Sequence, residues 1–517
     1  MVELKLIVRS EFERIRQAKI DRYKKLELLG DMHRANTLSM VKRAGSGHLG
    51  SSFSCLDIVT YLYYEEMNIT ALGIAHPDRD IYFSSKGHDV PGFYSVLYSL
   101  GILPEEQYLR LRRLGGVHGH PEMGVPGIEA NSGSLGMGIS KAKGMAHAKA
   151  IAGRKGRVFV MTGDGELQEG QNYEAFQTAV QQNITNLIVI VDHNKLQSDK
   201  QITEITNLGN MEAKFGAFGW HVLRCDGHDY RALEQTIEKA KALTDKPRII
   251  IADTIKGRGV SFMEHPQALA DNKGLYRWHS GAPDDESFTK GYAEIAGRID
   301  KTAADLRLDP VQYELVALHG DGPSGVSKEY VAEAYGQTLV ELGKTRKDLV
   351  VLDADLAADC RVRAFELQYP ERFIEDGIAE QDMVSMAGGL ALQGFLPVVN
   401  SFACFLASRA NEQIYTNTCE KTKIIYACHY AGLLPAGPGL SHQSVRDISL
   451  FGALPDFTIV QPGNALEAKL LTEYCVTTAH ENCMIRLIIG PSPRLVELPA
   501  GYKLAVGQGS VLADGKD

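Results

Sequence analysis

The chain has 517 residues, too many for one hydrophobic core, so we expect two or three domains. Its 44% apolar and 23% charged residues are typical of a globular protein, and its net charge of −9 gives no general attraction for nucleic acid or an anionic membrane. Its apolar runs are strand-length, the start at Met1 has no apolar signal core, and the eight cysteines form no CxxC pair. These features predict a cytoplasmic protein with reduced thiols and no membrane or nucleic-acid partner.

The first part of the chain predicts an α/β domain over residues 1–302. A helical pattern extends to about Lys42, and from there to about Gly259 helical stretches alternate with β-branched runs. These runs are Arg157–Met161, Leu187–Val191, His221–Cys225 and Arg248–Ala252. Such alternation favours a parallel sheet with helices on both faces.

Two of these runs each end near a hard oxygen ligand. Asp164 follows the first run within Gly163-Asp164-Gly165, and Asn194 follows the second. Parallel strands bring their carboxyl ends to one sheet edge, where ligands of open α/β sheets bind. A carboxylate, an amide oxygen and a main-chain carbonyl suit Mg²⁺ or Ca²⁺ bound to a diphosphate. The alternative, a tight glycine turn with solvated acids, is disfavoured by the Asn-bearing strand at this spacing.

The second part of the chain predicts another α/β domain, over residues 326–495. Asp309-Pro310 and the glycine-rich stretch 320–325 are typical of a linker, expected over residues 303–325. A helix from Ser327 to about Gly343 then precedes further strand-like runs: Leu349–Leu352, Lys423–Ala427, Phe457–Val460 and Met484–Ile489. Beyond these, Leu504–Gly509 predicts the first strand of a third domain, of which residues 496–517 would be a stub.

Four motifs in the first domain combine histidine with glycine. They are Gly45–Gly50, Ser84–Asp89, Gly119–Glu122 and Trp278–Gly281. Glycine lets the backbone crowd a ligand, so a neighbouring imidazole can approach a diphosphate or a reacting hydroxyl. Each motif alone is more typical of a structural or surface histidine, but together with the metal pattern they indicate a site.

With these motifs the chain resembles the transketolase family of thiamine-diphosphate enzymes, from about Arg34 to Gly490. Further matching motifs are Gly133–Gly138, Lys256–Gly259, Gly377–Met383 and Ser441–Gln443. The resemblance implies an α/β fold of two parallel-sheet, three-layer domains, one binding the diphosphate and the other the pyrimidine. It implies thiamine diphosphate and Mg²⁺ (or Ca²⁺) as cofactors, small sugars as substrates, and a homodimer with active sites at the subunit interface.

The resemblance also assigns roles to individual residues. The metal would be held by Asp164, Asn194 and the carbonyl of Leu196. Cofactor contacts from the first domain would come from His88, Gly133, Leu135, Gly165, Glu169, Asn194, Lys256 and His279. From the second domain, supplied by the partner subunit, they would come from Asp355, Glu380, Phe402 and Phe405. Substrate oxygens would meet the catalytic candidates His48, His120, His279, His429 and His442.

Glu380 is the remaining catalytic candidate, because in the family an acid at this position binds the pyrimidine ring nitrogen. A buried carboxyl with a raised pKa suits that role, since low dielectric favours its neutral form and a shared proton. The alternative is a solvated loop acid, which the surrounding Gly377–Met383 motif disfavours.

The chain departs from the family where substrate is recognised. The stretch Leu434–Leu440 lacks the usual acidic turn, the phosphate-binding arginine is replaced by Ala332, and the assisting serine by Asp359. Aspartate repels a phosphate, so a weakened preference for phosphorylated sugars is predicted. The arginines that would compensate are Arg361, Arg486 or Arg494. Most of the family's third domain is also missing; it is on a separate chain, naturally absent or truncated.

The function predicted from these residues is transfer of a two-carbon ketol unit from a ketose to an aldose. A relative with an altered substrate is the alternative within the family, and an E1-type oxidative decarboxylase is the alternative enzyme class. The motifs at His48, His120 and His442 match the sugar enzymes better. A non-catalytic relative is a further alternative, against which the retained Glu380 and Asp164 argue.

Overall fold

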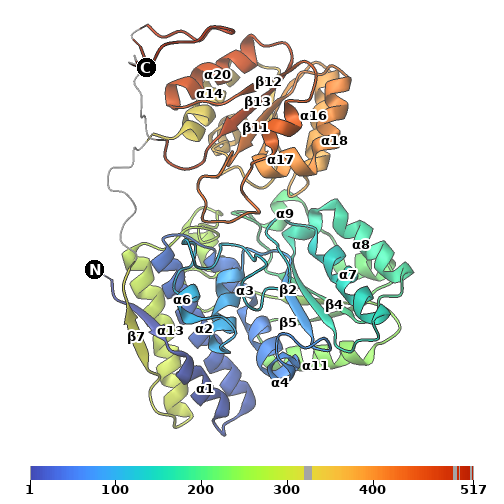
Figure 1. Ribbon diagram of the computed structural model, residues 1–517, viewed down its shortest axis with the longest axis vertical. Helices are drawn as coiled ribbons and strands as arrows, with labels where there is room; N and C mark the ends of the chain where they lie inside the picture. Colours follow the sequence, from blue (N-terminus) through green and yellow to red (C-terminus); the bar gives the residue numbers. More distant parts are fainter. Residues whose placement is uncertain (1, 319–328, 493–497, 500, 513–514, 516–517) are drawn as a thin grey trace. The chain divides into compact units, whose positions relative to one another are not determined.

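The computed structural model describes residues 2–318, 329–492, 498–499, 501–512 and 515 (Figure 1). The chain divides into two compact units, one covering residues 1–320 and the short segment 437–441, the other the remaining residues. Each unit contains one parallel sheet. Among the residues that the structure describes, none of the helices has both the length and the apolar character needed to span a bilayer.

The first unit is built on a five-stranded parallel sheet, which confirms the predicted architecture. In sheet order its strands are β2 (Ile81–Ser84), β3 (Val158–Gly163), β4 (Leu187–His193), β6 (Arg248–Asp253) and β5 (His221–Asp226). The apolar runs predicted from the sequence lie within β3 to β6. Because both faces of the central strands are covered, β3 and β4 are almost continuously apolar rather than alternating.

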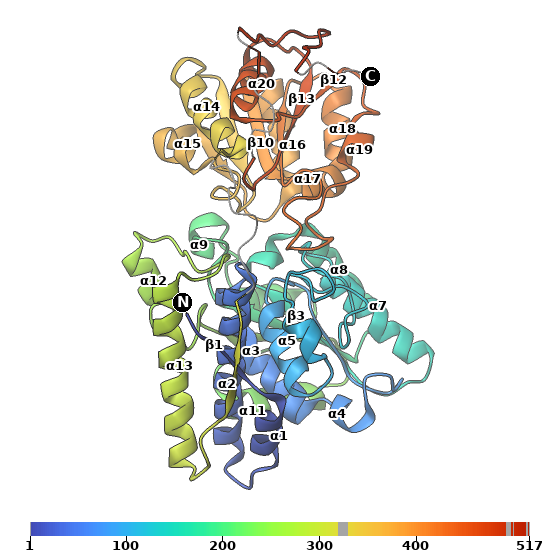
Figure 2. The ribbon, with the colours of Figure 1, turned by 60° about the vertical axis from the view of Figure 1, so that its left-hand side comes forward.

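Helices cover both faces of this sheet (Figures 1 and 2). The helices that share a core with one face are α2 (Arg22–Ala44), α3 (Leu49–Tyr61), α5 (Val90–Ser99), α11 (Tyr230–Ala242) and α13 (Asp285–Asp305). Those on the other face are α7 (Gly138–Ile151), α8 (Gly170–Gln181) and α10 (Met211–Ala217). Shorter helices in this unit are α1 (Arg9–Gln17), α4 (Ile69–Leu72), α6 (Glu105–Tyr108), α9 (Ile202–Ile205) and α12 (His265–Asp271).

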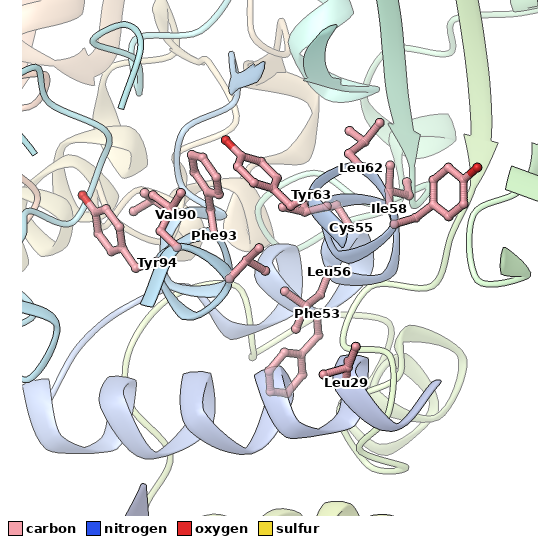
Figure 3. Packing of buried hydrophobic residues seen from close by; sticks show 14 of the residues in the cluster. Leu29, Phe53, Cys55, Leu56, Ile58, Leu62, Tyr63, Val90, Phe93 and Tyr94 are labelled. Carbon is pink, nitrogen blue, oxygen red and sulfur yellow. The ribbon is translucent and has the colours of Figure 1, made fainter. Parts of the chain in front are cut away.

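The larger of the first unit's two hydrophobic cores packs next to the loops that carry the histidines. Figure 3 shows Phe53 and Leu56 of α3 packed near Leu29 of α2, with Phe93 of α5 close to Tyr63. Helix α2 is capped at its start by Asp21, whose side chain accepts a hydrogen bond from the Lys24 amide. It ends at Gly45, where φ is +73°, and the chain then turns directly into the His48 loop.

The predicted linker contains regular structure in its described part. Helix α13 runs to Asp305, and β7 (Tyr313–Val316) pairs antiparallel with β1 (Leu4–Ile7). The expectation that residues 303–325 form a linker is therefore wrong up to Val316, and residues 319–325 lie outside the described range. The opening segment likewise begins with a strand rather than a helix.

The second unit has a six-stranded parallel sheet. In sheet order its strands are β12 (Phe457–Val460), β13 (Asn482–Leu487), β11 (Ile425–His429), β10 (Leu396–Phe402), β8 (Leu349–Asp353) and β9 (Phe373–Glu375). One face packs on α14 (Val331–Thr345), α15 (Arg363–Gln368) and α20 (Ala465–Thr477). The other packs on α16 (Glu380–Leu392), α17 (Ala403–Arg409), α18 (Asn411–Cys419) and α19 (Asp447–Phe451).

The end of the chain differs from the sequence-based expectation. Residues 504–509 have no strand partner, so the prediction of a strand at Leu504–Gly509 is wrong. The run contains two glycines, Gly507 has φ +75°, and most of its side chains are exposed. Val506 stays exposed and the segment has no partner strand among the described residues, and a lone strand is not stable.

Candidate functional site

The ends of β3 and β4 bring the predicted metal ligands together. Asp164 lies directly after β3, and one of its carboxylate oxygens accepts a hydrogen bond from the Lys195 amide at 2.7 Å. The other accepts from the Gly165 amide at 2.9 Å. Because Lys195 lies between Asn194 and Leu196, this contact fixes all three predicted ligand positions at one sheet edge. Asp164, Asn194 and Leu196 are all buried.

The turn after Asn194 leaves the Leu196 carbonyl available. Lys195 adopts φ +69°, and the following hairpin is closed by the Ile202 amide to the Lys195 carbonyl and the Gln197 amide to the Lys200 carbonyl. The Leu196 carbonyl takes no part in these bonds, and its amide donates to the Asn194 side-chain oxygen at 3.1 Å. A carboxylate, an amide oxygen and a main-chain carbonyl are the donors that Mg²⁺ and Ca²⁺ prefer, so these residues fit the implied metal.

A buried carboxylate that the sequence did not reveal orients Asn194. The Asp192 carboxylate accepts hydrogen bonds from the Asn194 side-chain nitrogen at 3.1 Å, the Lys86 ammonium at 2.6 Å and the Ser54 hydroxyl at 2.6 Å. Because Asp192 holds the side-chain nitrogen of Asn194, the side-chain oxygen of Asn194 points away from Asp192. Burial would raise the pKa of Asp192, but Lys86 and the hydroxyl donors lower it to about 2.

A second buried acid, Glu166, joins three of the predicted cofactor loops. Its carboxylate accepts from the Ser85 and Thr162 hydroxyls and from the Gly136 amide. The Gly133–Gly136 turn is close-packed, since a Cβ at Gly136, where φ is +90°, would lie 2.6 Å from that of Glu169. Glu166 therefore ties the predicted diphosphate loops to the end of β3. Burial raises the pKa of this carboxyl.

Three predicted histidines of the first unit surround a fourth. The ring of His48 lies 5.5 Å from His88, 5.6 Å from His120 and 5.2 Å from His279, between centroids. His88 and His279 are themselves 5.3 Å apart. Burial lowers the pKa of all four, to about 4 for His120. The site thus presents a group of neutral imidazoles.

Two lysines join this histidine cluster to the metal ligands. The Lys256 ammonium lies 3.0 Å from His279 Nδ1 and donates to the carbonyl of Gln197, the residue after Leu196. Lys86, two residues before His88, is paired with Asp192. Gly165, Glu169, Gly133 and Leu135 lie in the same set of loops, at the end of β3 and before α7. Most residues predicted for the first domain therefore gather at one sheet edge.

In the second unit, Glu380 is buried and paired. It is the first residue of α16, only 3% exposed, and its carboxylate accepts from Arg409 Nη1 at 3.0 Å. The sequence did not reveal this partner, which lies 29 residues away at the end of α17. The interpretation of Glu380 as a solvated loop acid does not fit its burial.

Aromatic side chains gather at the end of β10. Phe402 lies 5.7 Å from Phe405 and 5.6 Å from His442, between ring centroids, and His442 lies 5.4 Å from Phe405. Tyr430, which the sequence did not single out, lies 5.2 Å from Phe402. The structure therefore brings Phe402, Phe405 and His442 together, and flat apolar walls of this kind suit an aromatic ring.

His429 and Asp355 lie at the carboxyl edge of the same sheet. His429 ends β11, is fully buried beside Tyr335, and neither ring nitrogen has a hydrogen-bond partner among the described residues. Burial, followed by Arg361, lowers its pKa to about 3. Asp355 follows β8 in the left-handed region, at φ +59°, and its amide donates to Glu375.

Of the arginines considered as replacement phosphate ligands, one is committed to a buried ion pair and another lies near an exposed acid. Arg486 is buried and paired with Asp447 at 2.8 Å, and Arg361 lies 3.7 Å from Glu333. Arg494 falls outside the described residues. Ala332 is fully buried in α14.

Comparison with known proteins identifies the family. The model of the transketolase thiamine diphosphate binding domain matches residues 27–273, and that of the transketolase pyrimidine binding domain matches residues 328–488. Transketolase-like protein 2 of Mus musculus is 32% identical over 484 residues, which cover 91% of this chain and 75% of that protein. The chain belongs to the transketolase family.

Two further members of the transketolase family are similar over nearly the whole chain. Human transketolase is 29% identical over 495 residues, covering 94% of this chain and 77% of that protein. Transketolase-like protein 2 of Bos taurus is 30% identical over 483 residues, covering 89% of this chain and 74% of that protein. The predicted resemblance and the two thiamine-diphosphate-binding domains are thereby confirmed.

Proposed function

We propose that this protein transfers a two-carbon ketol unit from a ketose donor to an aldose acceptor, using thiamine diphosphate and Mg²⁺ or Ca²⁺. The observation that carries this proposal is the oxygen set of Asp164, Asn194 and Leu196, joined through Lys256 to the histidine cluster. When bound, the cofactor supplies the carbanion chemistry that amino-acid side chains lack.

The residues of the first unit would bind the diphosphate and position substrate. Asp164, Asn194 and the Leu196 carbonyl would hold the metal, while Lys256, His88 and His279 would face the diphosphate oxygens. His48 and His120 would contact substrate oxygens. Buried, neutral imidazoles suit this task, since each offers one donor and one acceptor at neutral pH.

The residues of the second unit would hold the pyrimidine. Phe402 and Phe405 would line its ring, Glu380 would hold a proton at its ring nitrogen, and Asp355 would support the same region. His429 and His442 would reach substrate oxygens. In the proposed homodimer these residues serve the diphosphate site of the partner subunit, so each active site needs both chains.

We propose further that phosphorylated sugars are not strongly preferred. Asp359 and Ala332 replace the expected phosphate ligands, and two candidate replacements, Arg361 and Arg486, lie beside acids. The Arg486 guanidinium, already neutralised by the buried Asp447, gives little net attraction to a phosphate. Free ketoses, or a donor such as hydroxypyruvate, are then suitable substrates.

Steady-state kinetics tests both parts of this proposal. With thiamine diphosphate and Mg²⁺ present, we expect turnover of hydroxypyruvate or xylulose with an aldose acceptor, and a kcat/KM within about tenfold of that for xylulose 5-phosphate. The Glu380→Gln variant is the matched control and should lower kcat by orders of magnitude while the fold is retained. A strong preference for the phosphorylated donor contradicts the substrate proposal, and near-normal turnover by Glu380→Gln contradicts the role of Glu380.

A further inference from the structure

The hydrogen bond between Arg112 and His48 fixes where the proton of that imidazole lies. Arg112 Nη2 is 3.3 Å from His48 Nδ1, and Nη1 is 3.2 Å from the Ser46 hydroxyl. A guanidinium donates hydrogen bonds and has no acceptor. His48 Nδ1 must therefore be the acceptor, and the ring proton of a neutral His48 must lie on Nε2.

The same argument applies to His279, and the opposite one to His88. The Lys256 ammonium, which also only donates, lies 3.0 Å from His279 Nδ1, so the proton of His279 lies on Nε2. His88 Nδ1 instead lies 2.9 Å from the main-chain carbonyl of Lys86. A carbonyl only accepts, so His88 carries its proton on Nδ1 and leaves Nε2 bare.

The surroundings of these rings keep them uncharged. Burial lowers the pKa of His48 most, and Arg112, His279, His88 and His120 lower it further. Burial also lowers the pKa of His279 most, followed by Lys256, His88, Lys86 and His120. After burial, the groups that shift either pKa most are cationic or are other histidines, and each of them disfavours the imidazolium.

We propose that Arg112 is a positioning residue that holds His48 as the Nε2–H tautomer, so that His48 and His279 are neutral hydrogen-bond donors at Nε2 and His88 alone of the three has an unprotonated Nε2. This inference rests on the proposed function for its chemical meaning. Two N–H donors suit carbonyl, hydroxyl or phosphate oxygens, whereas His88 Nε2 donates to a diphosphate oxygen only after it takes up a proton. A neutral N–H donor stabilises charge on oxygen without giving up its proton.

The direct test is the ¹⁵N NMR spectrum of the ring nitrogens in protein labelled on histidine, recorded without cofactor. The signals are assigned with His48→Gln, His88→Gln and His279→Gln. We expect Nε2–H with bare Nδ1 for His48 and His279, and the reverse for His88, throughout the range from pH 6 to pH 8. The His88 signals are the internal control, since they should show the opposite tautomer in the same sample.

Variants then isolate Arg112. In Arg112→Met we expect His48 to populate both tautomers and to titrate at higher pH. In Arg112→Lys we expect His48 to keep the Nε2–H form. The neighbouring, exposed Arg113 donates to the Ala44 carbonyl, so Arg113→Met is a matched control that should leave His48 unchanged. Arg112→Met should lower kcat/KM by about tenfold, because part of the protein population loses the buried His48 Nε2–H donor. In Arg112→Lys the loss should be smaller.

The result that overturns the proposal is a His48 ring with its proton on Nδ1, or a charged ring, in the unaltered protein. Identical His48 signals in Arg112→Met and the unaltered protein overturn the role of Arg112. The unaltered protein's spectrum decides even where a variant does not fold. Because these spectra need no cofactor, they are independent of the proposed function, whose failure would instead appear as absent cofactor binding or turnover.

Discussion

Arg409 and Glu380 form a buried ion pair in the second unit, with 3.0 Å between Nη1 and the carboxylate oxygen. Their side chains are 14% and 4% exposed, so solvent screens the pair far less than it screens a surface salt bridge. The guanidinium also lies 5.7 Å from the Phe405 ring centroid. Arg409 thus contacts two residues of the proposed pyrimidine site.

Removing Arg409 should therefore destabilise the second unit. In Arg409→Met the Glu380 charge is left buried without its partner, and the free energy of unfolding should fall by about 3–5 kcal/mol. Thermal and denaturant unfolding measure this loss. The double variant Arg409→Met with Glu380→Gln should recover much of it, because the unpaired charge is gone. Equal stability of Arg409→Met and the unaltered protein contradicts the assigned pair.

Asp192→Asn should weaken cofactor binding through Asn194. The variant loses the carboxylate that holds both the Lys86 ammonium and the Asn194 amide nitrogen, so the Asn194 oxygen is no longer fixed. We expect metal-dependent affinity for thiamine diphosphate to fall by about 10- to 100-fold, as for other groups that orient metal ligands. Calorimetry well below the unfolding temperature measures this.

A matched control separates this effect from a general loss of charge. Asp226 ends strand β5 at the edge of the same sheet, is exposed, and accepts from the His228 amide. Asp226→Asn should leave the affinity unchanged. If Asp192→Asn binds as tightly as Asp226→Asn, Asp192 does not orient the metal ligand.

His429 should make stability depend on pH. Its pKa is lowered to about 3 in the folded protein, against about 6.5 in an unfolded chain. Below pH 6.5 the unfolded chain takes up a proton that the folded chain refuses, so stability falls as pH decreases from 6.5 towards 3. Over that range His429 should change the free energy of unfolding by up to about 1.4 kcal/mol per pH unit.

The measurement is the free energy of unfolding between pH 4 and pH 8 in His429→Phe. We expect the free energy of unfolding to depend less steeply on pH than in the unaltered protein, because about one proton fewer is taken up on unfolding. Exposed His480 of the same unit provides the control, His480→Gln, which should keep the original slope. An unchanged slope in His429→Phe indicates that this ring is not held neutral.

Much of the fold follows from local sequence patterns. Runs such as Leu187–Val191 are apolar throughout, because a strand covered on both faces has no solvent side, and they form the central strands of the first sheet. Strand β10 was missed because Leu396–Phe402 contains Pro397 and the polar Asn400 and Ser401. Asn400 is tolerated there because it accepts from the buried Tyr335 hydroxyl, a contact that no local pattern reveals.

In the candidate site, too, local patterns predicted some residues and could not predict the contacts between distant ones. Asp164 and Asn194 could be predicted because each directly follows a recognisable strand. Their partners could not, since Asp192 meets Lys86 across 106 residues, and Arg409 meets Glu380 only when α16 and α17 are packed. The pairing of β1 with β7, some 300 residues later in the chain, is equally beyond a local pattern.

The central claim is that Asp164, Asn194 and the Leu196 carbonyl hold a divalent ion that binds the diphosphate of the cofactor. Calorimetric titration of thiamine diphosphate, with Mg²⁺ and with a chelator, tests it most directly. We predict saturable binding that requires Mg²⁺, is abolished in Asp164→Ala and is retained in Asp226→Asn. Absence of binding with Mg²⁺ present would contradict the account, and so would an affinity in Asp164→Ala, or in the presence of the chelator, equal to that of the unaltered protein with Mg²⁺.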